Sequence, residues 1–120
     1  MAVTVPRLLT LFLALGCATV AAHVNDRGMD YSPYKDQRGI PCCNDTDCRP
    51  ADDYAETTID GRPVVRLLID GMWITVSRYF VVAEDATDGR AHWCGKTLRF
   101  GATAEARPVP TCIILPPRNT

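Results

Sequence analysis

The clearest alternation of apolar and polar positions lies in two short runs, residues 64–69 and 72–77, which flank the dipeptide Asp70-Gly71. Asp-Gly between strand-like runs is typical of a two-residue type I′ turn, because both turn residues need a positive φ angle. Counting outward from the turn sets the register of the hairpin. One face then pairs Ile69 with Met72, Leu67 with Ile74 and Val65 with Val76. The opposite face pairs Leu68 with Trp73, Arg66 with Thr75 and Val64 with Ser77. The first face is wholly apolar and is predicted to face the core, whereas the second is mixed.

Shorter runs of the same kind predict further strands. Residues 57–59 and 62–63 flank Asp60-Gly61 and indicate a weaker hairpin, in which Pro63 favours an edge or a strand start. The runs 91–94, 97–100 and 111–115 are expected to be strands, and 79–82 a strand or the loop into one. Residues 41–50 predict a tight loop, with one short helical turn near 51–54 as an alternative. The chain is therefore expected to be mostly β, a small disulfide-stapled antiparallel β-sheet domain.

The first 22 residues have the pattern of a secretory signal peptide. Arg7 is followed by an apolar run and then by small residues that end at Ala22, and the run is too short to span a bilayer. A lipoprotein signal with lipidation at Cys17 is an alternative. We expect a signal peptide over 1–22, an irregular N-terminal arm over 23–40 and a β domain over 41–120. The protein is predicted to be periplasmic or secreted, without a transmembrane segment in the mature chain.

Net charge and chain length limit the classes of partner that the protein can be expected to bind. The chain has 13 Lys and Arg against 14 Asp and Glu. Removing residues 1–22, whose only charge is Arg7, leaves 98 residues with 12 cations and 14 anions, a formal charge of −2. This composition lacks the basic surplus that nucleic-acid binding needs. We expect a single small domain, a monomer, with an unknown partner in the envelope or outside the cell.

The cysteines after residue 22 are the main candidates for structural chemistry. They are Cys42, Cys43, Cys48, Cys94 and Cys112. Exported chains meet an oxidising compartment, where cysteines form disulfides, and five cysteines allow two bridges with one left over in 15 possible pairings. We expect Cys48 and one of Cys42 or Cys43 to join Cys94 and Cys112. The leftover cysteine permits thiol redox chemistry, which the acidic neighbours Asp45 and Asp47 disfavour because they raise a thiol pKa.

Three metal sites can be drawn on the sequence. Copper is the most specific: cleavage before His23 would expose an α-amine and an imidazole, and His92 is the only other histidine. This set resembles the histidine brace of periplasmic copper carriers and oxidative polysaccharide enzymes. A zinc site would use Cys43, Cys48, His92 and Cys94. The stretch 44–47 offers calcium ligands, but its residues are also typical of turns, and it contains an N-glycosylation sequon.

No catalytic motif is present. Ser32 and Ser77 are the only serines, and no nucleophile elbow surrounds either of them. We therefore expect no enzyme and no cofactor, with copper as the alternative cofactor. Aromatic side chains are then the candidate contacts of a binding protein, Trp73 and Trp93 first. The others are Tyr31, Tyr34 and Phe80.

The segment Pro41 to Cys48, the later His92-Trp93-Cys94 and the ending Cys112 to Pro117 resemble a family of small exported proteobacterial proteins. Its members carry a Cys-Cys-x-x-x-Asp-Cys segment, a His-x-Cys strand and a tail of cysteine, apolar residues and Pro-Pro. The family has no assigned activity. The resemblance implies bacterial export and a shared disulfide architecture, and it transfers no catalytic residue. The expected function is a binding or interaction module, and a copper-binding protein that uses His23 is the alternative.

Overall fold

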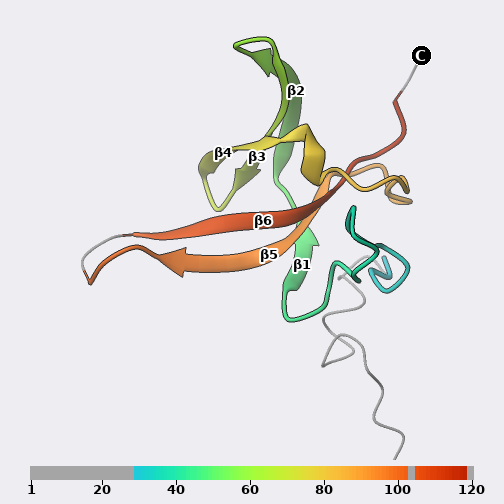
Figure 1. Cartoon of the computed structure of the whole chain (residues 1–120), viewed down its shortest axis with the longest axis horizontal. Helices are drawn as coiled ribbons and strands as arrows, with labels where there is room; N and C mark the ends of the chain where they lie inside the picture. The colour runs from blue at the N-terminus through green and yellow to red at the C-terminus, as the bar shows by residue number, and fades with distance from the viewer. Residues whose placement is uncertain (1–28, 103–104, 119–120) are drawn as a thin grey trace, which may run out of the picture.

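The structure, a computed structural model, describes residues 29–102 and 105–118. The strands are β1 (Asp47–Pro50), β2 (Asp53–Ile59), β3 (Arg62–Ile69), β4 (Met72–Ser77), β5 (His92–Arg99) and β6 (Ala106–Ile114), and a 3₁₀ helix η1 (Arg78–Phe80) follows β4. They form two three-stranded antiparallel sheets, ordered β1-β5-β6 and β2-β3-β4 (Figure 1). The expected fold class, a mostly β domain with disulfides, is confirmed.

The β3–β4 hairpin has the register that its turn predicts. All six expected pairs occur, from Ile69 with Met72 to Val64 with Ser77. Asp70 and Gly71 both have positive φ angles, of 51° and 77°, as a type I′ turn requires. Val65 and Leu67 are fully buried on the apolar face. The local sequence therefore determines this hairpin.

The second hairpin is longer than expected. The turn at Asp60-Gly61 joins β3 to β2, which pairs with it from Ile59 back to Asp53. Residues 47–50, expected within a tight loop, form β1, and the alternative of a helical turn near 51–54 is wrong, because β2 begins at Asp53. The amide N–H of Asp52 donates to the carbonyl of Leu68, so pairing with β3 continues to the start of β2.

The later segments differ from their expected boundaries. Residues 79–82 form the end of η1 and an isolated bridge from Val81 to Ile113 rather than a strand. The two runs expected at 91–94 and 97–100 are one strand, β5, with a bulge between Cys94 and Gly95. A Cβ atom on Gly95 would collide with the carbonyl oxygen of Val109, so glycine permits the close approach of β6 here.

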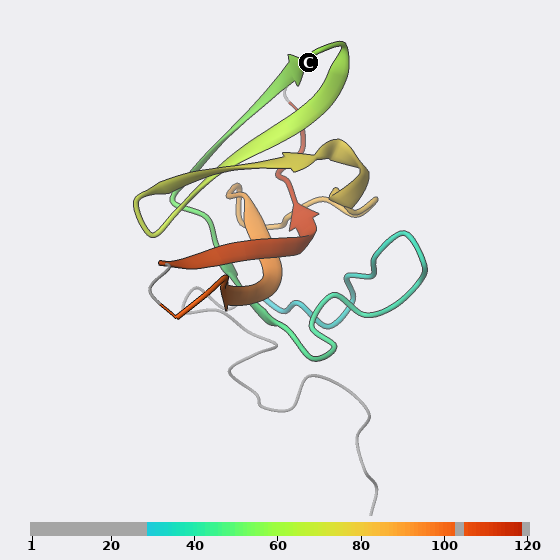
Figure 2. The ribbon, with the colours of Figure 1, turned by 60° about the vertical axis from the view of Figure 1, so that its left-hand side comes forward.

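Both faces of the β1-β5-β6 sheet are covered where β5 begins and β6 ends. Trp93 and Ile113 pack against Val65, Leu67 and Ile69 of the β2-β3-β4 sheet. Residues at alternate positions, such as Cys94 and Cys112, pack against the N-terminal arm, which we define as residues 29–46. Figure 2 shows this order, with the arm and the β2-β3-β4 sheet on opposite sides of β5 and β6. Both faces of β5 are thus buried from His92 to Gly95, which explains why the sequence shows no alternation there.

Candidate functional site

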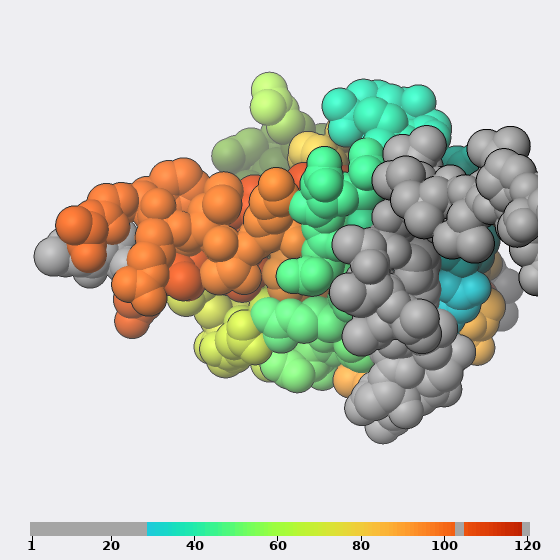
Figure 3. Space-filling model, turned by 90° about the horizontal axis from the view of Figure 1, so that it is seen from below, coloured from blue at the N-terminus to red at the C-terminus, as the bar shows by residue number. Residues whose placement is uncertain are grey.

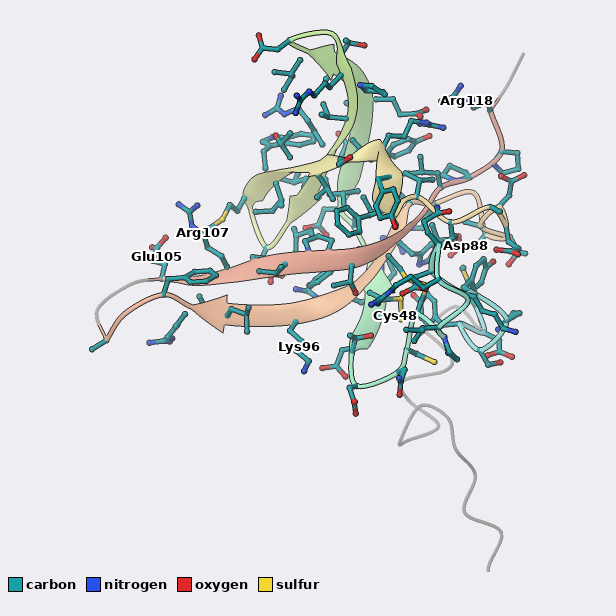
Figure 4. The ribbon with its side chains drawn as sticks, viewed as in Figure 1. Cys48, Asp88, Lys96, Glu105, Arg107 and Arg118 are labelled. Carbon is teal, nitrogen blue, oxygen red and sulfur yellow. A yellow bond between two sulfur atoms is a disulfide. The ribbon has the colours of Figure 1, made fainter. Side chains whose placement is uncertain are left out.

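Two disulfides join the arm to β6 and β1 to β5. Cys42 is bonded to Cys112 and Cys48 to Cys94, over sequence separations of 70 and 46 residues. This pairing agrees with the expected one. The yellow sulfur atoms at the labelled Cys48 mark the region where the arm meets β5 (Figure 4). The two bridges indicate an oxidising compartment outside the cytoplasm.

The expectation of one unpaired cysteine is wrong for this structure. Cys43 is also disulfide-bonded, so no cysteine in residues 29–102 and 105–118 is a free thiol. The zinc hypothesis needed Cys48 and Cys94 as thiolates, and these two residues are bonded to each other. Zinc coordination and thiol redox chemistry therefore lose their ligands and their nucleophile in this state of the protein.

His92 lies in a buried series of hydrogen bonds. Its imidazole is fully buried, with the Tyr31 hydroxyl 2.8 Å from Nδ1 and a carboxylate oxygen of Asp88 2.7 Å from Nε2. A carboxylate only accepts hydrogen bonds, so in the neutral ring Nε2 carries the proton and Nδ1 accepts from Tyr31. The Tyr31 and His92 rings also meet edge to face, with centroids 5.4 Å apart. The series joins the arm to β5 and to the loop that precedes it.

The buried hydrogen bonds of His92 limit its use both in catalysis and in copper binding. A tyrosine, a histidine and a carboxylate in sequence can relay a proton, but Tyr31 and His92 are each 0% exposed, so a substrate has no access to either. Both ring nitrogens of His92 are engaged, and coordination of copper would break one of these bonds. His23 lies outside the described residues. Within those residues no group of three His, Cys, Asp or Glu side chains is placed to hold a metal ion.

The expected surface aromatics divide into two groups. Trp73 and Phe80 are exposed, at 41% and 37%. Trp93, Tyr31 and Tyr34 are buried, so their expected place at the surface is wrong. Trp93 belongs to the core between the sheets, and the tyrosines fix the arm to the body.

A hydrogen bond holds Tyr34 in its buried position, and a guanidinium group covers Trp93. The hydroxyl of Tyr34 donates to the carbonyl oxygen of Asp85 at 2.9 Å. The guanidinium of Arg49 lies 5.0 Å from the centroid of the Trp93 ring and covers it. The same guanidinium donates two hydrogen bonds to the carboxylate of Asp70, which lowers the pKa of Asp70. Arg49 therefore links β1 to the β3–β4 turn across the buried indole.

An accessible cleft lies between the arm and η1. It has a volume of about 300 Å³, the lower end of the range for ligand pockets. Its lining residues are Asp36, Gln37, Arg38, Tyr79, Phe80 and Thr111. The Tyr79 and Phe80 rings meet edge to face at 5.3 Å, and Tyr79 is 61% exposed. The cleft thus presents two aromatic rings beside a cation and hydrogen-bonding groups.

The arm side of the cleft is held in one conformation by hydrogen bonds. Asp36 accepts from the backbone N–H groups of Arg38 and Ile40 and from Nε and Nη2 of Arg38. The hydrogen bond from the Arg38 side chain is the main reason why the pKa of Asp36 lies below its usual value, and the same contact raises the pKa of Arg38. Gln37 donates through Nε2 to the carbonyl of Val81, just after η1, at 2.7 Å.

The other side of the cleft is fixed as well. The Ser77 hydroxyl caps η1 by accepting from the N–H of Tyr79, and Val82 donates its N–H to the carbonyl of Ile113 at 2.9 Å. Thr111 precedes Cys112, whose disulfide to Cys42 ties β6 to the arm. Both walls are therefore held in place without a ligand, which lowers the entropic cost of binding.

A second, more polar hollow lies around Glu56 on β2. Its carboxylate accepts hydrogen bonds from Arg78 and from Arg118, the latter at 2.7 Å. Burial, together with the charge of Arg118, lowers the pKa of Arg78. Arg118 lies near the C-terminal end of the described chain (Figure 4). One carboxylate thus faces two cations here, and their contacts link the β2-β3-β4 sheet to the C-terminal segment.

Of the cleft residues, Phe80 was predicted only as a surface aromatic, and Arg38 and Tyr79 were not predicted as candidate contacts. Arg38 and Tyr79 are 41 positions apart and belong to no shared motif, so only the fold brings them together. Comparison of the chain with protein-family models, curated proteins and solved structures finds no match. No helix in the described ranges is long and apolar enough to cross a membrane.

Proposed function

We propose that this protein is an exported binding module of the bacterial envelope, periplasmic or secreted, that holds part of a partner protein in the cleft between the arm and η1. The convergence of Arg38, Tyr79 and Phe80 on one preformed cavity carries the proposal. Tyrosine and arginine are enriched among the residues that dominate protein–protein affinity, particularly where they line a pocket.

The chemistry of the cleft defines the group that it takes. The perpendicular rings of Tyr79 and Phe80 offer an apolar surface for an aromatic or aliphatic side chain. Arg38 uses Nε and Nη2 for Asp36, while its Nη1 makes no hydrogen bond to the described residues. That nitrogen is available to a carbonyl or carboxylate of the partner. A side chain of this size, with its adjoining backbone carbonyl, matches the volume and the donors of the cleft.

Export is supported by three features. The apolar stretch before Ala22 has the pattern of a signal peptide, and the two disulfides indicate an oxidising compartment. The resemblance of the Cys42 to Cys48 segment to a family of exported proteobacterial proteins favours a bacterial envelope over a eukaryotic lumen. We propose membership of that family on the same segment.

A photo-crosslinking amino acid at Tyr79 of the full chain, expressed in an exporting bacterium, tests the cleft directly. We expect a discrete adduct with one envelope protein, identified by mass spectrometry. The adduct should be lost when Arg38→Ala is added. The matched control places the same crosslinker at Thr58, an exposed position on β2 that does not line the cleft.

The identified partner is then titrated with the purified module. Tyr79→Ala is expected to weaken binding about tenfold or more, whereas Thr58→Ala leaves it unchanged. Equal adducts from both positions, or equal affinities for Tyr79→Ala and the parent protein, would exclude the cleft as the binding site. N-terminal sequencing of the exported protein tests the cleavage before His23 in the same preparation.

A further inference from the structure

The distal half of the β5–β6 hairpin extends away from the rest of the molecule. Figure 1 shows β5 and β6 continuing past β1 and past the β2-β3-β4 sheet, and Figure 3 shows the same projection from below. Burial changes abruptly at the bulge: residues 92–95 are buried, while residues 96–100 are all exposed. Residues 96–100 belong to neither core cluster, so their composition is free to serve another purpose.

Apolar and cationic side chains share one face of this projection. The register places Lys96 opposite Val109 and Leu98 opposite Arg107, and opposed residues of an antiparallel pair lie on the same face. Phe100 follows directly after β5 and is also exposed. Leu98 is 40% exposed and Phe100 66%, which is the highest value among the large exposed apolar residues of the described chain.

The projection is a positive region of a chain that is otherwise acidic. Lys96, Arg99 and Arg107 oppose one anion, Glu105, which gives a formal charge of +2. The whole chain has a charge of −1, so the remainder, with 10 cations and 13 anions, has −3. None of the three cations forms an ion pair with a described residue. Figure 4 shows Lys96 on β5, Arg107 on β6 and Glu105 just before β6, with Glu105 and Arg107 nearer to the end of the hairpin.

We propose that the distal β5–β6 hairpin docks on an anionic lipid surface. Leu98 and Phe100 enter the boundary between headgroups and acyl chains, and Lys96 and Arg107 contact the lipid phosphates. Arg99, which pairs with Ala106 on the opposite face, adds to the positive charge of the projection. Unpaired cations beside exposed apolar side chains are the composition of interfacial membrane anchors. A hydrated polyanion would satisfy the cations but would offer no apolar environment to Phe100, so the two apolar residues favour a lipid surface.

The small number of groups in this contact makes the membrane binding weak and reversible. Three cations and two apolar side chains make a weak anchor, comparable to a single acyl chain, with a partition constant on the order of 10⁴ M⁻¹. Its dependence on charge makes it sensitive to salt, since the Debye length falls from about 10 Å at 0.1 M to about 3 Å at 1 M. The docked hairpin would hold the protein at the membrane by the end remote from the disulfide-linked arm (Figure 1).

Flotation of the disulfide-intact exported protein with vesicles tests this proposal. We expect binding to vesicles that contain phosphatidylglycerol, little binding to pure phosphatidylcholine, and release at high salt. The variant Lys96→Gln/Arg99→Gln/Arg107→Gln should lower the partition constant by about a hundredfold, and Phe100→Ser by about tenfold. All four positions are exposed, so circular dichroism should show an unchanged fold.

Matched controls separate the hairpin from general charge and apolarity. Lys35→Gln/Arg62→Gln/Arg66→Gln removes the same charge elsewhere, and Ile59→Ser removes an exposed apolar side chain at the other hairpin. Both should float as the parent protein does. Failure of the parent protein to float overturns the proposal, as does an equal loss in the controls. Binding to dextran sulfate that equals or exceeds binding to vesicles, with no effect of Phe100→Ser, would assign the hairpin to a soluble polyanion instead.

Discussion

Replacing Tyr31 by phenylalanine removes a single hydroxyl from a hydrogen bond between two fully buried side chains. The phenylalanine ring keeps the packing of Tyr31, which is 0% exposed, while Nδ1 of His92 loses the donor that lies 2.8 Å away. His92 is itself 0% exposed, so water is not available to replace the hydroxyl without a rearrangement of the core. The substitution therefore removes the hydroxyl while it keeps the ring in the core.

The expected cost is that of an unsatisfied buried acceptor. Removing one partner of a buried hydrogen bond costs about 1–3 kcal/mol, more than the net contribution of an average hydrogen bond. For a domain of 60–100 residues this lowers the melting temperature by roughly 5–20 °C. It is also a large part of a total stability of about 5–15 kcal/mol. The arm should loosen first, because Tyr31 is one of the residues that attach it.

Urea unfolding of the oxidised protein, followed by far-UV circular dichroism, measures the loss. Tyr79→Phe is the matched control, since Tyr79 is exposed and its hydroxyl makes no hydrogen bond to the described residues; it should change stability by less than about 0.5 kcal/mol. A double-mutant cycle with His92→Leu should give a coupling energy of about 1 kcal/mol or more between the two positions. A cost for Tyr31→Phe no larger than that for Tyr79→Phe would refute the reasoning.

The remaining predictions concern the disulfides, a titrating tyrosine and a turn. Replacing Cys48 and Cys94 by alanine opens a loop of 46 residues and should cost about 4 kcal/mol in denaturant unfolding; a loss below about 1 kcal/mol would contradict the chain-entropy account. Burial raises the pKa of Tyr34, so the folded state holds its proton more tightly than the unfolded state. Stability should thus be full below the unfolded pKa near 10 and fall as the pH rises through the folded pKa. Tyr34→Phe should lessen this alkaline loss, and an unchanged pH profile would argue against it. Gly71→Ala should cost about 1–2 kcal/mol because φ is 77° there, and Gly71→Asn should recover part of it; equal stability of both variants would contradict the turn assignment.

Local chemistry accounts for what could be predicted about the hairpins. Asp70-Gly71 and Asp60-Gly61 adopt positive φ angles because their side chains permit it, and the turn then fixes which residues face each other. Alternation decides which face is buried, so Val65 and Leu67 could be assigned to the core before the fold was known. Strand ends were less predictable, since β2 extends only because β3 offers it a partner along its whole length.

Segments buried on both faces could not be predicted in the same way. Trp93 reads as an accessible aromatic, yet it is 2% exposed because the β2-β3-β4 sheet covers one face of β5 while the arm covers the other. Its neighbour His92 points to the arm, where Tyr31 meets it across 61 positions of sequence. No periodicity encodes a contact of that kind.

The sequence by itself determined the β class and the register of the β3–β4 hairpin, because turn residues and alternation act over a few neighbouring positions. It also determined that the cysteines of the 42–48 loop bond to the later strands, because few disulfide pairings are possible. Only the tertiary structure decided that both nitrogens of His92 are engaged, that Arg38 and Tyr79 share a cleft, and that the distal β5–β6 hairpin stands free of the core. These features depend on which surfaces of distant segments pack against one another. The packing of the whole chain decides this, so it cannot be predicted from any short stretch of the sequence.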